Sequence, residues 1–299
     1  MTSSERRQVV VTGSGALCPA GIGGDALLAW WREPGSATHV PDFQPAEFIR
    51  NARQLRTMQR QFQLAASAAM LALRNAGLPD AAALPQQGIV LERAGTAVAI
   101  GDISPVTADL LQVLREVPLR DGAPDWARFG EIGVHQLHPF RRLTLLPNMA
   151  AAHVSLLLGL RGPSCTFTSG ARAGEQAVTE ACWMIAGGHA DFMVIEAADT
   201  PDHAFTANPV KEAAAAVLLE ARASAEQRGA SILAVFEPDG TLSEREARRS
   251  FLPSVPVAGS LLDVVVWLES LRGGGTACAL ELPGLRLQPW AASAGGGQA

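Results

Sequence analysis

The sequence has almost no lysine and no tyrosine. Lys211 is the only lysine among 299 residues, so arginine carries nearly all of the positive charge. The arginines are not gathered into a basic block, the formal net charge is −5, and the sequence pI is about 5.7. Proteins that bind nucleic acid usually present a basic face, so this class of partner is excluded.

Long apolar runs are also missing. Residues 1–7 are followed by an apolar stretch that is too brief for the core of a signal peptide. No run approaches the roughly 20 apolar residues of a membrane-spanning helix. The composition is 48% hydrophobic, which is enough to bury a substantial core. We therefore expect a cytoplasmic protein that does not associate with a membrane.

Cysteine is sparse, and no Cys-x-x-Cys pair occurs, so neither a zinc site nor a disulfide framework is indicated. The thiols, which we expect to be reduced, lie far apart: Cys18, Cys165, Cys182 and Cys278. His135 and His138 are three residues apart, but no carboxylate or thiol accompanies them in a ligand pattern. We expect no bound metal.

The segment Gly13–Cys18 resembles a dinucleotide-binding turn only superficially. It lacks the third glycine in register, Pro19 follows it, and no acidic residue ends a strand about 20 positions later. We predict a structural turn at this segment and no nucleotide cofactor.

Short apolar runs alternate with segments of helical period. The expected strands are Gln8–Thr12, Thr96–Ile100, the strand end Phe167–Thr168, and Ala190–Ala197. The expected helices are Gly24–Arg32, Arg56–Ala76, Pro105–Val113, Met149–Gly159 and Ala173–Ala186. Residues 117–142 are polar and contain proline, which indicates an excursion or a partner-contacting loop. This alternation, with continuously apolar strands, predicts a layered α/β fold.

The last third repeats the pattern less clearly. Ala213–Leu219 and Ser231–Phe236 are interpreted as paired strands around a short helix, Ser224–Gln227. Leu261–Leu271 is expected to be helical, and Thr276–Leu282 is expected to be a final strand.

The turn at Ala171 carries the strongest functional signal. Residues 162–178 read as a buried strand, a tight turn of small residues and the start of a helix. A residue on such a turn lies beside unpaired amide N–H groups, which stabilise an anion and lower the pKa of a thiol. A cysteine would be an activated nucleophile at this position, whereas the methyl group of Ala171 cannot attack. Ser169 lacks the Gly-x-Ser-x-Gly context of a serine nucleophile.

Several segments occur together in an order that identifies a resemblance. They are VVVTGSGALCPAG at Val9–Gly21, the helix Leu55–Leu78, LLPNMAAAHVSLLLGLRGPS at Leu145–Ser164, and GGHADFMVIEAAD at Gly187–Asp199. Over residues 8–200 the chain thus resembles the β-ketoacyl synthase branch of the thiolase-like superfamily. Ala213–Phe236 is similar to the strand–helix–strand segment of the family's second half.

The resemblance implies a thiolase-like layered αβαβα fold of the α/β class. It predicts a complete N-terminal half at residues 1–205 and a shortened C-terminal half at residues 206–290. Residues 291–299 are expected to be a disordered tail.

The resemblance also implies a site that has lost its chemistry. Ketosynthases use a cysteine at the elbow to accept an acyl group from a carrier protein. Two histidines in the second half help to decarboxylate the extender. The cysteine falls on Ala171 and the second histidine on Ser260, and residues 237–256 contain no histidine for the first. We therefore expect no catalytic residue and no cofactor in this chain.

In type II polyketide systems a non-catalytic partner, the chain-length factor, supports the active ketosynthase and walls its acyl tunnel. The resemblance predicts such a subunit, in a heterodimer or a dimer of heterodimers, with an acyl carrier protein reached through the complex. Short partners of this kind occur in bacterial polyene and aryl-polyene pathways. The candidate tunnel or interface residues are Ile103, Thr107, Leu111 and Arg172.

Two other functions remain open. One is an enzyme with rewired chemistry that transfers or hydrolyses an acyl group through Ser169, Ser260 or Cys165. The other is a stand-alone acyl-binding scaffold. On the favoured hypothesis the chain has no activity alone and serves as a subunit of a β-ketoacyl synthase complex.

Overall fold

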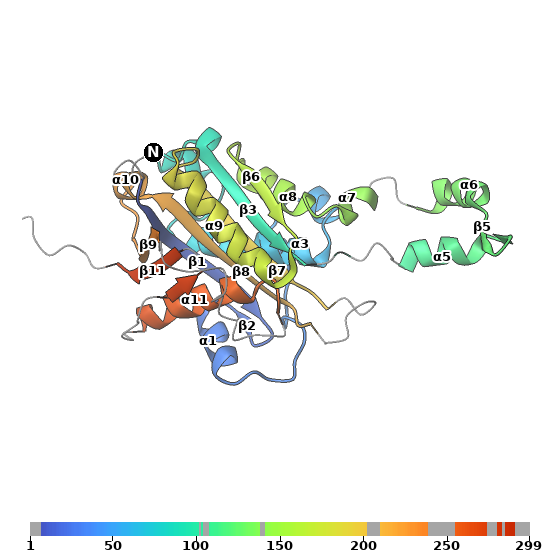
Figure 1. The fold of residues 1–299 in the computed structure, drawn as a ribbon, viewed down its shortest axis with the longest axis horizontal. Helices are drawn as coiled ribbons and strands as arrows, with labels where there is room; N and C mark the ends of the chain where they lie inside the picture. Colours follow the sequence, from blue (N-terminus) through green and yellow to red (C-terminus); the bar gives the residue numbers. More distant parts are fainter. Residues whose placement is uncertain are drawn as a thin grey trace, which may run out of the picture.

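A nine-stranded mixed sheet forms the body of the protein in the computed structural model (Figure 1). Its strands lie in the order β10-β11-β9-β1-β8-β7-β3-β6, and β2 pairs with β1. β3 runs parallel to β6 and β7, and the other pairs are antiparallel. The structure describes residues 7–101, 103, 108–137, 141–201, 210–238, 255–273, 280–282 and 285–290.

The element bounds follow the predicted alternation. The strands are β1 Val9–Cys18, β2 Gly21–Ile22, β3 Ala94–Ile100, β4 Leu119–Arg120, β5 Ala123–Pro124, β6 Ser164–Phe167, β7 Phe192–Asp199, β8 Ala213–Ala221, β9 Ala234–Pro238, β10 Leu280–Leu282 and β11 Leu285–Pro289. The α-helices are α1 Gly24–Arg32, α2 Ala52–Leu55, α3 Arg60–Asn75, α4 Ala83–Gln86, α5 Ala108–Glu116, α6 Trp126–Gln136, α7 Arg141–Leu145, α8 Met149–Leu158, α9 Ala173–Ala186, α10 Arg222–Gln227 and α11 Gly259–Arg272. Short 3-10 helices lie at Pro45–Glu47 (η2), Leu91–Arg93 (η3) and Gly170–Arg172 (η4).

Helices cover both faces of the sheet. The central strands β1, β7 and β8 are buried along their whole length, and alternate side chains point to opposite faces. α3 and α8 pack on the face that presents Val194 and Leu218. α9 and α11 pack on the face that presents Ile195 and Leu219, and α9 crosses in front of the sheet in Figure 1. The predicted layered α/β fold is confirmed.

The prediction of a turn at Gly13–Cys18 was wrong, because these residues continue β1. The strand carries a bulge between Val11 and Gly13 and then pairs with β8 as far as Leu17. A Cβ atom at Gly13 would lie 2.4 Å from the carbonyl oxygen of Ala72, and one at Gly15 would lie 2.5 Å from that of Ala68. Both glycines are therefore explained by the close approach of α3 to the strand, not by a change of chain direction.

The predicted pairing of the strands at Ala213–Leu219 and Ser231–Phe236 was also wrong. Val9 pairs with Ala221 of β8 on one side and with Phe236 of β9 on the other, so β1 lies between the two strands. The short helix between them forms as α10. In the part of the chain that is described, β9, β10 and β11 thus belong to the same nine-stranded sheet as β1, β7 and β8.

The predicted excursion forms a helical arm, which we define as residues 108–137. α5 packs against α6, and β4 pairs with β5 between them. Asp125 caps α6 by accepting N–H groups from Ala127 and Arg128, each at 3.1 Å. The arm stands away from the sheet (Figure 1). The helix expected at Pro105–Val113 forms as α5, and residues 104–107 lie outside the described part.

Candidate functional site

The candidate site lies where β6 leads into α9. β6 ends at Phe167, and η4 turns the chain into α9, as the sequence predicted. Ala171 lies in the middle of η4 and is exposed. Its methyl group supplies neither a nucleophile nor a hydrogen bond, so this turn presents backbone without reactive side-chain chemistry.

The start of α11 meets the same turn. α11 contacts η4 and α9, and Ser260 is buried in its first turn. A Cβ atom at Gly174 would lie 2.8 Å from the carbonyl oxygen of Val257 and 3.7 Å from Cβ of Ser260. Only glycine at position 174 therefore allows this approach. The structure thus brings together the elements that carry Ala171 and Ser260, the two positions predicted to have lost catalytic residues.

Asp199 fixes the start of α11 and was not singled out from the sequence. It ends β7 and is buried, and its Oδ2 accepts N–H groups from Val257 at 3.0 Å and Ala258 at 2.7 Å. Burial raises the pKa of Asp199 to about 7, although the two N–H donors oppose the shift. An acidic residue at the end of an apolar strand was the only signal in the sequence. The two hydrogen bonds make Asp199 a structural clamp between β7 and the start of α11.

The alternative nucleophiles are poorly activated. The Ser169 hydroxyl donates to Oε1 of Gln176. Cys165 lies on β6, and burial, with smaller contributions from Glu180 and Glu196, raises the pKa of its thiol to about 11. At neutral pH a thiol with such a pKa stays protonated, so it is a weak nucleophile. Neither group has the environment that the rewired-enzyme hypothesis requires.

The described histidines do not assemble at this site. His39 lies in an exposed loop beside Thr38, and His135 belongs to the arm. His153 is buried on α8 with its ring 6.0 Å from that of Phe62, and burial lowers its pKa. His189 follows α9 at the end remote from Ala171. Within the described residues, no histidine therefore lies on η4 or at the start of α11.

The predicted tunnel and interface residues are not gathered in one place. Ile103 is half-buried and packs against the core beneath α3 and α8. Leu111 is exposed on the arm, and Arg172 is exposed beside Ala171. Burial raises the pKa of Glu175, one turn from Arg172, whose charge partly offsets the shift. Thr107 lies outside the described residues, so the tunnel assignments stay predictions.

No group of His, Cys, Asp and Glu side chains among the described residues could hold a metal ion. Cys18, Cys165 and Cys182 are free thiols, and Cys278 lies outside the described part. Among the described helices, none is both long and apolar enough to cross a membrane.

The N-terminal domain of the β-ketoacyl synthases matches residues 31–217, which are most of the chain and include η4 and α9. The chain belongs to the β-ketoacyl synthase family. This membership confirms the predicted resemblance for the segment around Ala171. The match ends before α11, so the assignment of Ser260 to a lost histidine of the β-ketoacyl synthases stays a prediction, as does the division at residue 205.

Curated relatives of this β-ketoacyl synthase family member come from two bacterial settings. Nodulation protein E of Rhizobium leguminosarum bv. trifolii is 32% identical over 212 residues, which are 65% of this chain and 47% of that protein. The tetracenomycin polyketide synthase ketoacyl synthase alpha subunit of Streptomyces glaucescens is 29% identical over 217 residues, 67% of this chain and 48% of that protein. The chain spans about half the length of these relatives.

Solved structures share the fold. One is a type II PKS acyl-carrier protein in complex with its ketosynthase, AntDE:AntF, whose matching chain gives a TM-score of 0.71 at 18% identity. Another is the ishigamide ketosynthase/chain length factor, with a TM-score of 0.62 at 17% identity. Both matches cover 95% of this chain and 100% of the other. The predicted thiolase-like ketosynthase fold is confirmed.

Proposed function

We propose that the chain is a non-catalytic subunit of the chain-length-factor type. It pairs with an active ketosynthase in type II polyketide biosynthesis of the polyene kind, and it shapes the acyl tunnel of the pair. The observation that carries this proposal is the exposed Ala171 on η4, where acyl transfer would need an activated nucleophile. The similarity to a polyketide synthase alpha subunit supports the polyketide setting.

The surroundings of Ala171 support a loss of more than one catalytic group. α11 carries Ser260 in its first turn, and Asp199 accepts the backbone N–H groups of Val257 and Ala258 at the start of this helix. A thiol restored at position 171 would therefore find no imidazole among the described neighbours. On this proposal the partner supplies the nucleophile and the bases. This chain forms part of the wall of the acyl tunnel and supports the fold of the active subunit.

The outer edge of β6, left unpaired by the described strands, is evidence for a partner subunit that continues the sheet. β6 ends the sheet, and within the described residues no strand pairs with its outer edge. The two helices that contact β6 from opposite faces carry exposed apolar side chains, Leu156 on α8 at 73% exposure and Trp183 on α9 at 63%. An open strand edge between apolar groups favours continuation of the sheet into another subunit.

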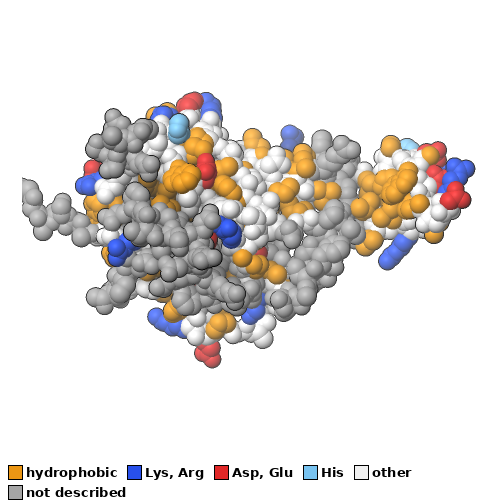
Figure 2. Space-filling model, in the orientation of Figure 1, with side chains coloured by type: hydrophobic (Ala, Val, Ile, Leu, Met, Phe, Trp, Pro, Cys, Tyr) orange, Lys and Arg blue, Asp and Glu red, His pale blue; other side chains and the backbone are white. Residues whose placement is uncertain are grey.

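The arm adds a second apolar surface. Leu119, Trp126 and Val134 are 72%, 64% and 78% exposed. Figure 2 shows hydrophobic side chains gathered over the arm, with charged side chains at its outer end. Exposed apolar side chains gathered in one patch mark interaction surfaces, so we assign the arm to contact with the same partner.

Co-expression tests the proposal. The chain is produced alone and together with an active ketosynthase from an adjacent gene and its acyl carrier protein. We expect no elongation by the chain alone, and a 1:1 complex that elongates acyl groups on the carrier. We also expect the product length to change when this subunit is exchanged for another of its kind.

The Ala171→Cys variant is the matched control. It restores a thiol without restoring the histidines, so it should remain inactive without the partner. Ketosynthase activity from the unmodified chain alone would overturn the proposal. An active ketosynthase that makes the same products without this chain would overturn it as well.

A further inference from the structure

A separate cavity of about 500 Å³ lies at the other end of the central strands from Asp199 and Ala171. The segment after α4, the start of β7, the end of β8 and α10 form its wall. β7 places this cavity roughly 25 Å from Asp199, at the rise per residue of a strand. Its volume is within the range of small-molecule sites, about 300–1,000 Å³.

One side of the cavity is formed by a buried ion pair. Glu220 binds Arg228 through two hydrogen bonds, 2.8 Å to Nε and 2.6 Å to Nη2. Both side chains are almost completely buried, and the Glu220 carboxylate also accepts the hydroxyl of Thr12. Each carboxylate oxygen therefore has a strong donor, and the pair presents few free acceptor sites to a ligand.

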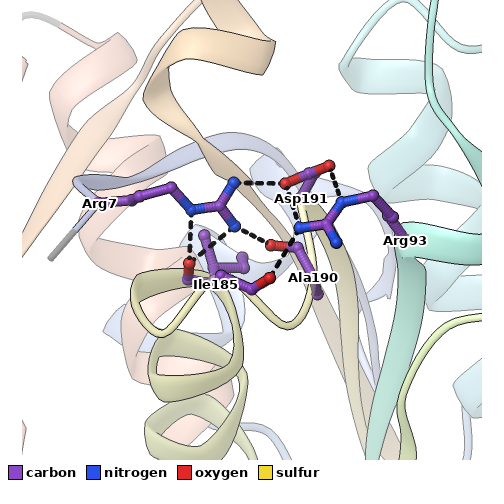
Figure 3. Close-up of polar contacts among 6 residues, drawn as sticks. Arg7, Arg93, Ile185, Ala190 and Asp191 are labelled. Atoms are coloured by element: carbon purple, nitrogen blue, oxygen red, sulfur yellow. Dashed lines mark hydrogen bonds and ion pairs between the residues drawn. The ribbon is translucent and has the colours of Figure 1, made fainter.

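The second carboxylate at the cavity is held by two arginines. Asp191 lies between Arg7 and Arg93, which also donate to the backbone carbonyls of Ile185, Ala190 and Gly188 (Figure 3). The hydrogen bonds from Arg93 and Arg7 lower the pKa of Asp191, so its carboxylate stays ionised at neutral pH. This acceptor is satisfied as well.

The balance of charge and hydrogen-bond donors around the cavity favours an anion. Asp191, Glu220 and Arg228 are the charged side chains that line the cavity, and Arg7 and Arg93 bind Asp191 from outside the lining. These two carboxylates and three guanidinium groups together carry one net positive charge. Arg228 lines the cavity, and its Nη1 donates to the carbonyl oxygen of Ala76 at 3.4 Å in addition to the two hydrogen bonds to Glu220. Two of its five N–H groups, one on Nη1 and one on Nη2, therefore remain for a ligand. The side-chain amides of Gln86, Gln87 and Gln227 also line it, and none of them bonds another described residue.

We propose that this cavity is a binding site for a small anion that carries one carboxylate or phosphate group. The anion accepts hydrogen bonds from the free N–H groups of Arg228 and from the glutamine amides, and it compensates the remaining positive charge. The proposal does not depend on the role of the chain in polyketide synthesis, because the cavity contains no part of the η4 site.

Calorimetric titration of the full chain, alone or in its complex, tests the site. The probes are acetate, inorganic phosphate and acetamide, the last being a neutral compound of the same size and shape as acetate. We expect acetate or phosphate to bind with a millimolar or lower Kd, and acetamide to bind at least tenfold more weakly. Tighter binding of phosphate assigns a phosphate ligand, and tighter binding of acetate assigns a carboxylate.

Two variants of equal charge locate the binding. Gln227→Glu adds a carboxylate at the cavity, whereas Gln112→Glu adds one on the exposed surface of the arm. Both side chains are exposed, so folding should be retained, as circular dichroism can verify. We expect Gln227→Glu to weaken the anion at least tenfold and Gln112→Glu to change the Kd less than twofold. Equal weakening by both variants, equal binding of acetamide, or no binding of either anion would overturn the proposal.

Discussion

The sheet and the arm bury their residues in opposite ways. Every residue of β1, β7 and β8 is buried, and helices cover both faces of these strands. The arm packs α5 against α6 but leaves Leu119, Trp126 and Val134 largely in water. The sheet therefore derives its stability from within the chain, whereas the arm and the β6 edge present apolar surface that a second protein can cover. Mutations in the two regions should have different consequences, for folding in one and for assembly in the other.

Glycine substitutions should show the largest difference in the free energy of unfolding between the sheet and the arm. Gly15→Val places side-chain atoms against the carbonyl oxygen of Ala68, where even a Cβ atom would be 2.5 Å away. We expect a loss of about 3 kcal/mol or more in the free energy of unfolding, because neither β1 nor α3 can move apart cheaply. Gly130→Ala in α6 is the control, since an added Cβ there meets no atom within 4 Å apart from its chain neighbours and the backbone of its own helix. It should gain about 0.5–1 kcal/mol of helix stability. Chemical denaturation measures both, and an equal loss would contradict the contrast.

Charge at the β6 edge should abolish assembly without harming the fold. The double variant Leu156→Glu and Trp183→Glu places carboxylates on the helices that flank the open strand. We expect the affinity for the partner ketosynthase to fall at least 100-fold, because burying two unpaired charges is costly. The melting temperature of the separate chain should be unchanged. Ile22→Glu, on β2, is the control, and unaffected binding by the double variant would remove the edge from the interface.

Truncation of arm side chains should have a smaller effect of the same kind. Trp126 packs edge-on against Phe129, with ring centroids 5.8 Å apart, but most of its surface is exposed. We expect Trp126→Ala to weaken partner binding about tenfold, as for an aromatic anchor. Surface plasmon resonance against the partner gives the affinity. If the variant instead unfolded the body, the arm would belong to the same cooperative unit as the sheet.

The pH dependence of the free energy of unfolding should also differ between the sheet, which contains Asp199, and the arm, which contains Asp121. The pKa of Asp199 is about 7 in the folded state, against about 3.9 for an unfolded aspartate, so the folded state binds the extra proton between these values. Stability should therefore fall as pH rises from about 4 to about 7, by an amount on the order of a few kcal/mol from this group.

Asp199→Asn removes that contribution and should flatten the slope relative to the unmodified chain. Asp121→Asn, on the exposed turn of the arm, should leave the slope unchanged. Urea unfolding at several pH values supplies both slopes. Parallel curves for Asp199→Asn and the unmodified chain would show that the clamp does not titrate in this range.

Local patterns in the sequence predicted the helices well. Ala173–Ala186 forms with the predicted bounds, and α3 forms where apolar residues recur at three- and four-residue intervals. α8 forms within the predicted range Met149–Gly159. The same local reasoning placed a turn at Gly13–Cys18, since glycine more often marks a turn than a strand under a helix. The contact with Ala68 and Ala72 that explains those glycines comes from a helix more than fifty residues away, so no local pattern records it.

The candidate site was partly predictable for the same reason. Ala171 could be identified because the turn around it is local and carries a family motif. The clamp by Asp199 and the anion cavity could not, because each is assembled from segments that are distant in sequence. Asp191, for example, meets Arg7 and Arg93 only after three elements have packed together.

The position of β1 has a consequence for how the chain is made. Val9 leaves the ribosome early, yet its strand partners are residues 221 and 236. At roughly 5–20 residues per second, synthesis of the intervening segment takes on the order of 10–40 seconds. Throughout that delay a strand that is entirely buried in the folded protein lacks both neighbours, and such long-range pairing is intrinsically slow to form. Aggregation during synthesis is therefore a hazard for this chain, and the yield of folded protein should depend on chaperone capacity and expression rate.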